Sequence, residues 1–115
     1  NQVTNNNDPT AHAEIVTIRN ACFELQTFNL TGVEIYTSCE PCPMCLSAIY
    51  WSHINKIYYG NSRFDAALIG FDDKLIYDEL SIDLEKRIIP SIQINQKEAI
   101  NTFKSWEQKI DKIKY

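Results

Sequence analysis

The stretch AHAEIVTIRNACFELQTFNLTGVEIYTSCEPCPMC, residues 11–45, holds a helix pattern, a strand pattern and three closely spaced cysteines. Its first part predicts a helix that ends near Thr27, because apolar residues recur at helical spacing at Ile15, Ile18, Cys22 and Leu25. Residues 33–38, VEIYTS, alternate and are rich in strand formers, so they predict a β-strand. A second helix is expected from about Pro41–Cys42 to Trp51, with the aromatic side chains of Tyr50 and Trp51 in the core.

The rest of the chain continues this alternation of strands and helices. We expect a polar loop at 4–9, a strand at 56–59, a loop or short helix at 61–73, a short helix at 74–80, a last strand at 89–95 and an amphipathic helix at 97–113. Helices between successive strands indicate an α/β architecture with parallel strand pairs. At 115 residues, the chain is expected to form one domain, residues 1–115.

Composition narrows the classes of partner. The formal net charge is −4 and Lys and Arg form no dense patch, which argues against nucleic acid as the main partner. There is no apolar run long enough to span a membrane. Four cysteines without an export signal indicate a reducing, cytoplasmic compartment, where closely spaced cysteines more often bind metal or act in catalysis than form disulfides.

Cys42 and Cys45 form a CxxC pair at the predicted start of the second helix, where the helix dipole and free backbone N–H groups favour anionic sulfur. His12 lies at the start of the first helix, and helix starts in a sheet with parallel crossovers meet at one edge. These residues can supply three metal ligands and leave a position open, which is typical of a catalytic zinc site. A disulfide, a redox pair and a structural metal clip are the alternatives for the cysteines.

Glu14 follows His12 by two residues and therefore does not share its helix face. Its carboxylate can instead reach over the open position and move a proton between a zinc-activated water and a leaving group. HxE followed by PCxxC is a pattern known from zinc deaminases. Cys39 lies before Pro41, at the end of the predicted strand, and is expected to pack beside the site rather than to bind metal.

Over nearly its whole length, the sequence resembles the cytidine deaminase-like superfamily and, within it, the bacterial guanine deaminases. The resemblance is carried by NDPTAHAE, YTSCEPCPMCLSAIYW, DAALIGFDD and the terminal KY. It implies a three-layer α-β-α sandwich with a central mixed sheet and helices on both faces. It also implies an N-terminal helix and two further strands that this sequence lacks, and with them some backbone contacts to the base.

The resemblance implies a reaction in which a zinc-activated water attacks the amino-bearing carbon of guanine, so that ammonia leaves and xanthine remains. It assigns zinc binding to His12, Cys42 and Cys45, and proton transfer to Glu14. It further assigns substrate binding to Asn1, Asp73 and Tyr115, and implies a homodimer with a swapped C-terminal segment. The alternatives are a tRNA adenosine deaminase, a deaminase of another base or nucleoside such as guanosine or cytosine, and an inactive zinc-binding scaffold.

Overall fold

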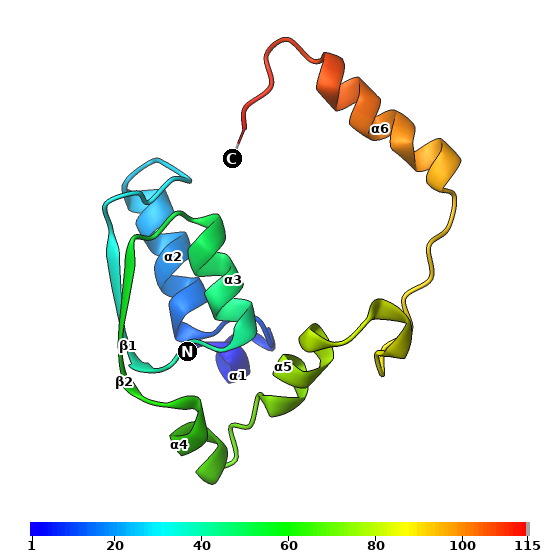
Figure 1. Ribbon diagram of the computed structural model, residues 1–115. Helices are drawn as coiled ribbons and strands as arrows, with labels where there is room; N and C mark the ends of the chain where they lie inside the picture. Colours follow the sequence, from blue (N-terminus) through cyan, green and yellow to red (C-terminus); the bar gives the residue numbers. More distant parts are fainter. Residues whose placement is uncertain (115) are drawn as a thin grey trace. The chain divides into compact units, whose positions relative to one another are not determined.

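The computed structural model describes residues 1–114 as two compact units, Asn1–Asp78 and Glu79–Tyr115, with the terminal residue itself outside the described part (Figure 1). The first unit is built from helices and a two-stranded sheet. Its elements are α1 (Val3–Asn6), α2 (Ala13–Glu24), β1 (Glu34–Cys39), α3 (Pro43–Trp51), β2 (Lys56–Asn61), α4 (Arg63–Leu68) and most of α5 (Lys74–Ser81).

The strands β1 and β2 pair in parallel, and α3 forms the crossover between them (Figure 1). Helices α2 and α3 pack against each other on one side of the strand pair. Side chains along β1 alternate between exposed and covered positions, with Ile35 buried. The core of the unit consists of Ala11, Ile15, Leu30, Ile35, Cys45 and Ile49.

Local sequence explains where the helices of the first unit begin. Pro43 occupies the first position of α3, where its missing N–H costs nothing and its fixed φ suits a helix. Ser62 and Asp65 form a capping box at the start of α4, each side chain bonding the other residue's backbone N–H. The Asp72 side chain accepts a hydrogen bond from the backbone N–H of Lys74, at the start of α5.

The second unit contains the short 3₁₀ helix η1 (Leu84–Lys86) and the helix α6 (Gln96–Gln108). The strand predicted at 89–95 is wrong: this segment is irregular, and Ile92 and Ile94 are 82% and 73% exposed. Alternating isoleucines form a strand only beside another strand, and no neighbouring strand pairs with them among the described residues.

Three smaller expectations also need correction. The helix predicted at 97–113 ends at Gln108, and the loop predicted at 4–9 contains the end of α1. Tyr50 and Trp51, expected in the core, are 75% and 66% exposed. None of the helices among residues 1–114 combines the length and the apolar character needed to cross a membrane.

Candidate metal centre and catalytic pocket

Three metal-binding side chains meet where α2 and α3 begin. His12 is the N-cap residue of α2, Cys42 is the N-cap residue of α3, and Cys45 lies in the first turn of α3. An N-cap side chain commonly bonds a free N–H group of its own helix. Neither His12 nor Cys42 does so here, and both side chains turn toward each other instead.

The spacing of the three donor atoms fits a tetrahedral zinc ion. His12 Nδ1 lies 3.7 Å from Cys42 Sγ and 3.6 Å from Cys45 Sγ, and all three atoms lie within 4.8 Å of one another. Usual Zn–N and Zn–S bond lengths around a tetrahedral ion place nitrogen and sulfur about 3.6 Å apart. In the described part of the chain the donor cluster has three members, which is one fewer than a closed structural zinc site requires.

The two thiols differ in their tendency to ionise. A hydrogen bond from the Cys45 side chain, assisted by backbone N–H groups and by His12, lowers the pKa of Cys42 to about 6. The same interaction and burial raise the pKa of Cys45. Cys42 is therefore available as a thiolate near neutral pH, which is the form that binds a metal.

Glu14 lies in the first turn of α2 beside the three donors, but it is not a member of the cluster. Its Oε2 is 3.6 Å from Cys45 Sγ, and its Oε1 is 3.3 Å from the hydroxyl of Thr37 on β1. The half-buried carboxylate is thus next to the metal position without occupying it. This is the placement that a proton-transfer group requires.

A pocket of about 680 Å³ opens beside these residues, within the size range of small-molecule sites. Its wall includes the predicted site residues Asn1, His12, Glu14, Cys42 and Asp73, whereas Cys45 is fully buried and does not line it. Among the lining side chains, five are carboxylates: Glu14, Glu40, Asp65, Asp72 and Asp73. Such a wall attracts hydrogen-bond donors and repels anions.

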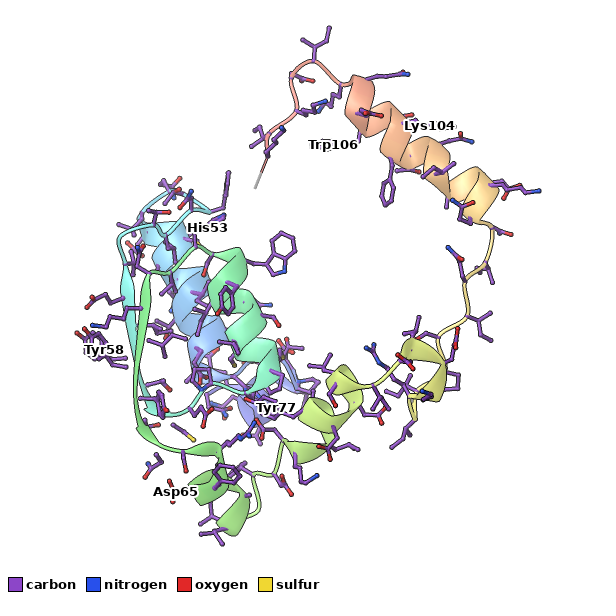
Figure 2. The ribbon with its side chains drawn as sticks, in the orientation of Figure 1. His53, Tyr58, Asp65, Tyr77, Lys104 and Trp106 are labelled. Atoms are coloured by element: carbon purple, nitrogen blue, oxygen red, sulfur yellow. The ribbon has the colours of Figure 1, made fainter. Side chains whose placement is uncertain are left out.

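Arg63 lines the pocket and links the helices that form its far wall, a role that the sequence did not indicate. The backbone N–H of Arg63 donates to the Glu40 carboxylate at 3.0 Å. Its guanidinium lies 4.4 Å from the centre of the Tyr77 ring, so it joins the start of α4 to α5 (Tyr77 is labelled in Figure 2). Asp73 lies between these helices and contributes electrostatically to the raised pKa of Tyr77, which is mainly due to burial. No motif in the sequence signals this link.

Four further residues lie as follows. The Cys39 thiol lies 3.6 Å from the Ser62 carbonyl oxygen and is not in the donor cluster. The side chain of Asn1 accepts a hydrogen bond from the backbone N–H of Val3. His53 is exposed after the end of α3 (Figure 2). Tyr115, predicted to bind substrate, lies outside the described residues.

Comparison with known proteins agrees with this site. Residues 1–61 match the family model described as the cytidine and deoxycytidylate deaminase zinc-binding region. The chain is 46% identical to the guanine deaminase of Bacillus subtilis over all of its 115 residues, which correspond to 74% of that protein. It is 41% identical to the tRNA-specific adenosine deaminase of Haemophilus influenzae, but over 71 residues, 57% of this chain and 41% of that one.

Solved structures show the same difference between a match over the whole chain and a match over part of it. The X-ray structure of guanine deaminase from Bacillus subtilis matches all of this chain and 73% of its own length with a TM-score of 0.96 at 46% identity. A structure from a study of tRNA:A34 deaminases matches 54% of this chain and 45% of its own, with a TM-score of 0.52 at 46% identity. The full-length match confirms the predicted α/β fold class.

Proposed function

The chain belongs to the cytidine and deoxycytidylate deaminase zinc-binding family, and from that membership we propose that it deaminates guanine hydrolytically to xanthine and ammonia. Its cofactor is one zinc ion per subunit. The observation that carries the proposal is the Glu14 carboxylate beside the His12, Cys42 and Cys45 donors at the wall of a pocket of small-molecule size.

The choice of guanine rests on how much of the chain each relative covers. The similarity to guanine deaminase runs through α4 and α5, which form the far wall of the pocket. The similarity to the tRNA-specific adenosine deaminase of Haemophilus influenzae covers little more than half of the chain. The wall rich in carboxylates also favours a neutral base that presents N–H groups over a phosphorylated substrate.

His12, Cys42 and Cys45 hold the zinc ion in this mechanism. When bound, zinc supplies Lewis-acid activation of the attacking water. Glu14 accepts a proton from that water at its carboxylate and delivers it to the substrate, so that the amino group leaves as ammonia. One water is consumed for each ammonia released, and the ring carbon that carried the amino group becomes a carbonyl.

Asn1 and Asp73 orient the base in the same proposal. A carboxylate at Asp73 can accept hydrogen bonds from the N–H edge of guanine, and the Asn1 amide can both donate and accept. A role for Tyr115 in substrate binding is proposed from the family resemblance alone. These contacts fix which ring atom faces Glu14, and thereby the amino group that is lost.

The test is ammonia release from guanine, adenine, cytosine and a tRNA anticodon stem, each with and without a zinc chelator. We expect chelator-sensitive release from guanine alone. Release from the tRNA stem would transfer the function to RNA editing. Zinc binding without release from any substrate would support the inactive scaffold instead.

We also propose a homodimer in the cytoplasm whose C-terminal segments are exchanged. Helix α6 supports it, because its apolar residues Phe103 and Trp106 are 72% and 45% exposed, and Ile110 beyond it is fully exposed. Light scattering coupled to size exclusion should give the mass of two chains. A monomer at micromolar concentration would refute the exchange.

A further inference from the structure

Thr37 lies on the side of β1 that faces the metal centre, although no motif marks it as functional. Along β1 the covered and exposed positions alternate, with Ile35 buried, Tyr36 exposed and Thr37 half-buried. This alternation turns the Thr37 side chain toward α2, where Glu14 lies. Thr37 is also one of the residues that line the pocket.

The Thr37 hydroxyl has two oxygen neighbours. Its Oγ1 is 3.3 Å from Glu14 Oε1 and 3.0 Å from the carbonyl oxygen of Cys39. A hydroxyl donates one hydrogen bond, accepts others and rotates freely between partners. It can therefore donate to the Glu14 carboxylate or to the Cys39 carbonyl, and in the second case its oxygen remains free to accept a bond.

The second neighbour of the Glu14 side chain is the Cys45 thiol, 3.6 Å from Oε2. A cysteine that binds a metal has lost its proton, so it has no hydrogen to donate. Once the three donors hold a metal ion, Thr37 is therefore the one of these two neighbours that can still donate a hydrogen bond to the Glu14 side chain.

We propose that Thr37 is a positioning residue for the deamination, its hydroxyl holding the Glu14 carboxylate in line with the pocket. The inference rests on the proposed function, because it gives Thr37 a role through the proton-transfer residue. The hydroxyl suits this task better than a fixed donor. It can serve Glu14 as donor or as acceptor, so the contact lasts while the carboxylate takes up and releases its proton.

The central comparison is Thr37→Val with Thr37→Ser. Valine keeps the shape and suits a strand, whereas serine keeps the hydroxyl. Loss of a hydrogen bond to a charged group predicts that Thr37→Val lowers kcat at least about tenfold. KM should change less than about twofold, because Thr37 orients Glu14 rather than the base. Thr37→Ser should stay within about threefold of the parent enzyme.

Thr17→Val is the matched control, since Thr17 is exposed on the same helix as Glu14 and outside the pocket. Zinc content should be equal in all variants, because Thr37 is not a donor in the cluster. If Thr37→Val fails to fold, Thr37→Ala takes its place in the same comparison.

Crystal structures of the zinc-loaded parent, Val and Ser proteins give a readout that does not depend on turnover. The Glu14 carboxylate should bond residue 37 in the parent and in Thr37→Ser, and should shift in Thr37→Val. An unchanged kcat in Thr37→Val, or equal losses in the valine and serine variants, would overturn the proposal. A parent enzyme inactive on guanine would refute the proposed function, and an unmoved Glu14 in Thr37→Val would then refute the positioning separately.

Discussion

At the residue scale, the centre depends on two side chains that do not cap their own helices. His12 and Cys42 both occupy N-cap positions, and their side chains approach each other across the two helix starts. The backbone N–H groups at the start of α3 favour negative charge, which helps to stabilise the Cys42 thiolate. The N-cap position of Cys42 therefore both places its sulfur at the metal centre and favours its ionised form.

Glu14→Gln should separate zinc binding from catalysis. Glutamine keeps the size of the side chain but does not take up a proton, so kcat should fall by about 10²–10⁴-fold. Zinc content should stay at the parent level, because Glu14 is outside the donor cluster. Glu24→Gln, at the exposed far end of the same helix, is the control and should leave kcat unchanged. Near-parent turnover by Glu14→Gln would remove Glu14 from the mechanism.

At the scale of elements, the sequence predicts best where a local pattern decides the structure. The helix at 43–51 and the strand at 56–61 follow from Pro43, from apolar spacing and from alternation, and they lie within two residues of their expected bounds. The segment 89–95 has similar alternation but depends on a partner strand, which no local pattern can supply. The Arg63–Tyr77 contact joins two helices through residues 14 apart, so it too is invisible to local reasoning.

Arg63→Ala should loosen the far wall of the pocket. A cation over an aromatic ring contributes about 0.5–2 kcal/mol, and Arg63 is half-buried, so the free energy of unfolding should fall by about 1 kcal/mol. Arg63→Lys should recover part of this loss, and Tyr77→Phe should cost less than Tyr77→Leu because it keeps the ring. Urea titrations followed by circular dichroism measure these differences. Equal midpoints for Arg63→Ala and the parent would show that the contact is neutral.

The capping box at the start of α4 predicts a stability effect that depends on pH. Hydrogen bonds from the Ser62 side chain, and then from its backbone N–H, lower the pKa of Asp65 below its usual 3.8. A lowered pKa means that the ionised form stabilises the fold above about pH 4, and that this stabilisation is lost as the pH falls through the lowered pKa.

Asp65→Asn should therefore be less stable than the parent at pH 7, and the difference should shrink by pH 3. Urea midpoints at both pH values measure it. Ser62→Ala should reproduce most of the effect, because it removes the hydroxyl that donates to Asp65 Oδ2. A difference of the same size at both pH values would assign the effect to helix propensity instead.

At the scale of the whole molecule, the metal donors, Glu14 and the pocket all belong to the first unit. The sequence predicts the donors because their spacing and helix context are local. It does not predict Thr37 or Arg63, whose roles depend on which side of a strand or helix meets a distant element. These contacts join segments that are distant in the sequence, so they become evident only in the folded structure.

Zinc removal should destabilise the first unit in particular. Binding to the folded state alone stabilises it by about 4 kcal/mol when free zinc exceeds Kd a thousandfold. The chain has two tryptophans, Trp51 in the first unit and Trp106 in the second. In Trp106→Phe, chelation should lower the urea midpoint reported by Trp51 fluorescence. In Trp51→Phe, the midpoint reported by Trp106 should move less. Equal shifts for both reporters would mean that the units unfold together.

The parallel pairing of β1 with β2 also has a consequence for how a sample of this chain behaves. Within residues 1–114, β1 and β2 pair only with each other, so each strand has one edge without a strand partner. Open strand edges are templates for pairing with other chains and for aggregation. Exposed aromatic side chains at Tyr36 and Tyr59 add apolar surface beside these edges. Charged side chains on an edge strand oppose such pairing, so a lysine placed on the exposed side of β1 should raise solubility at high concentration.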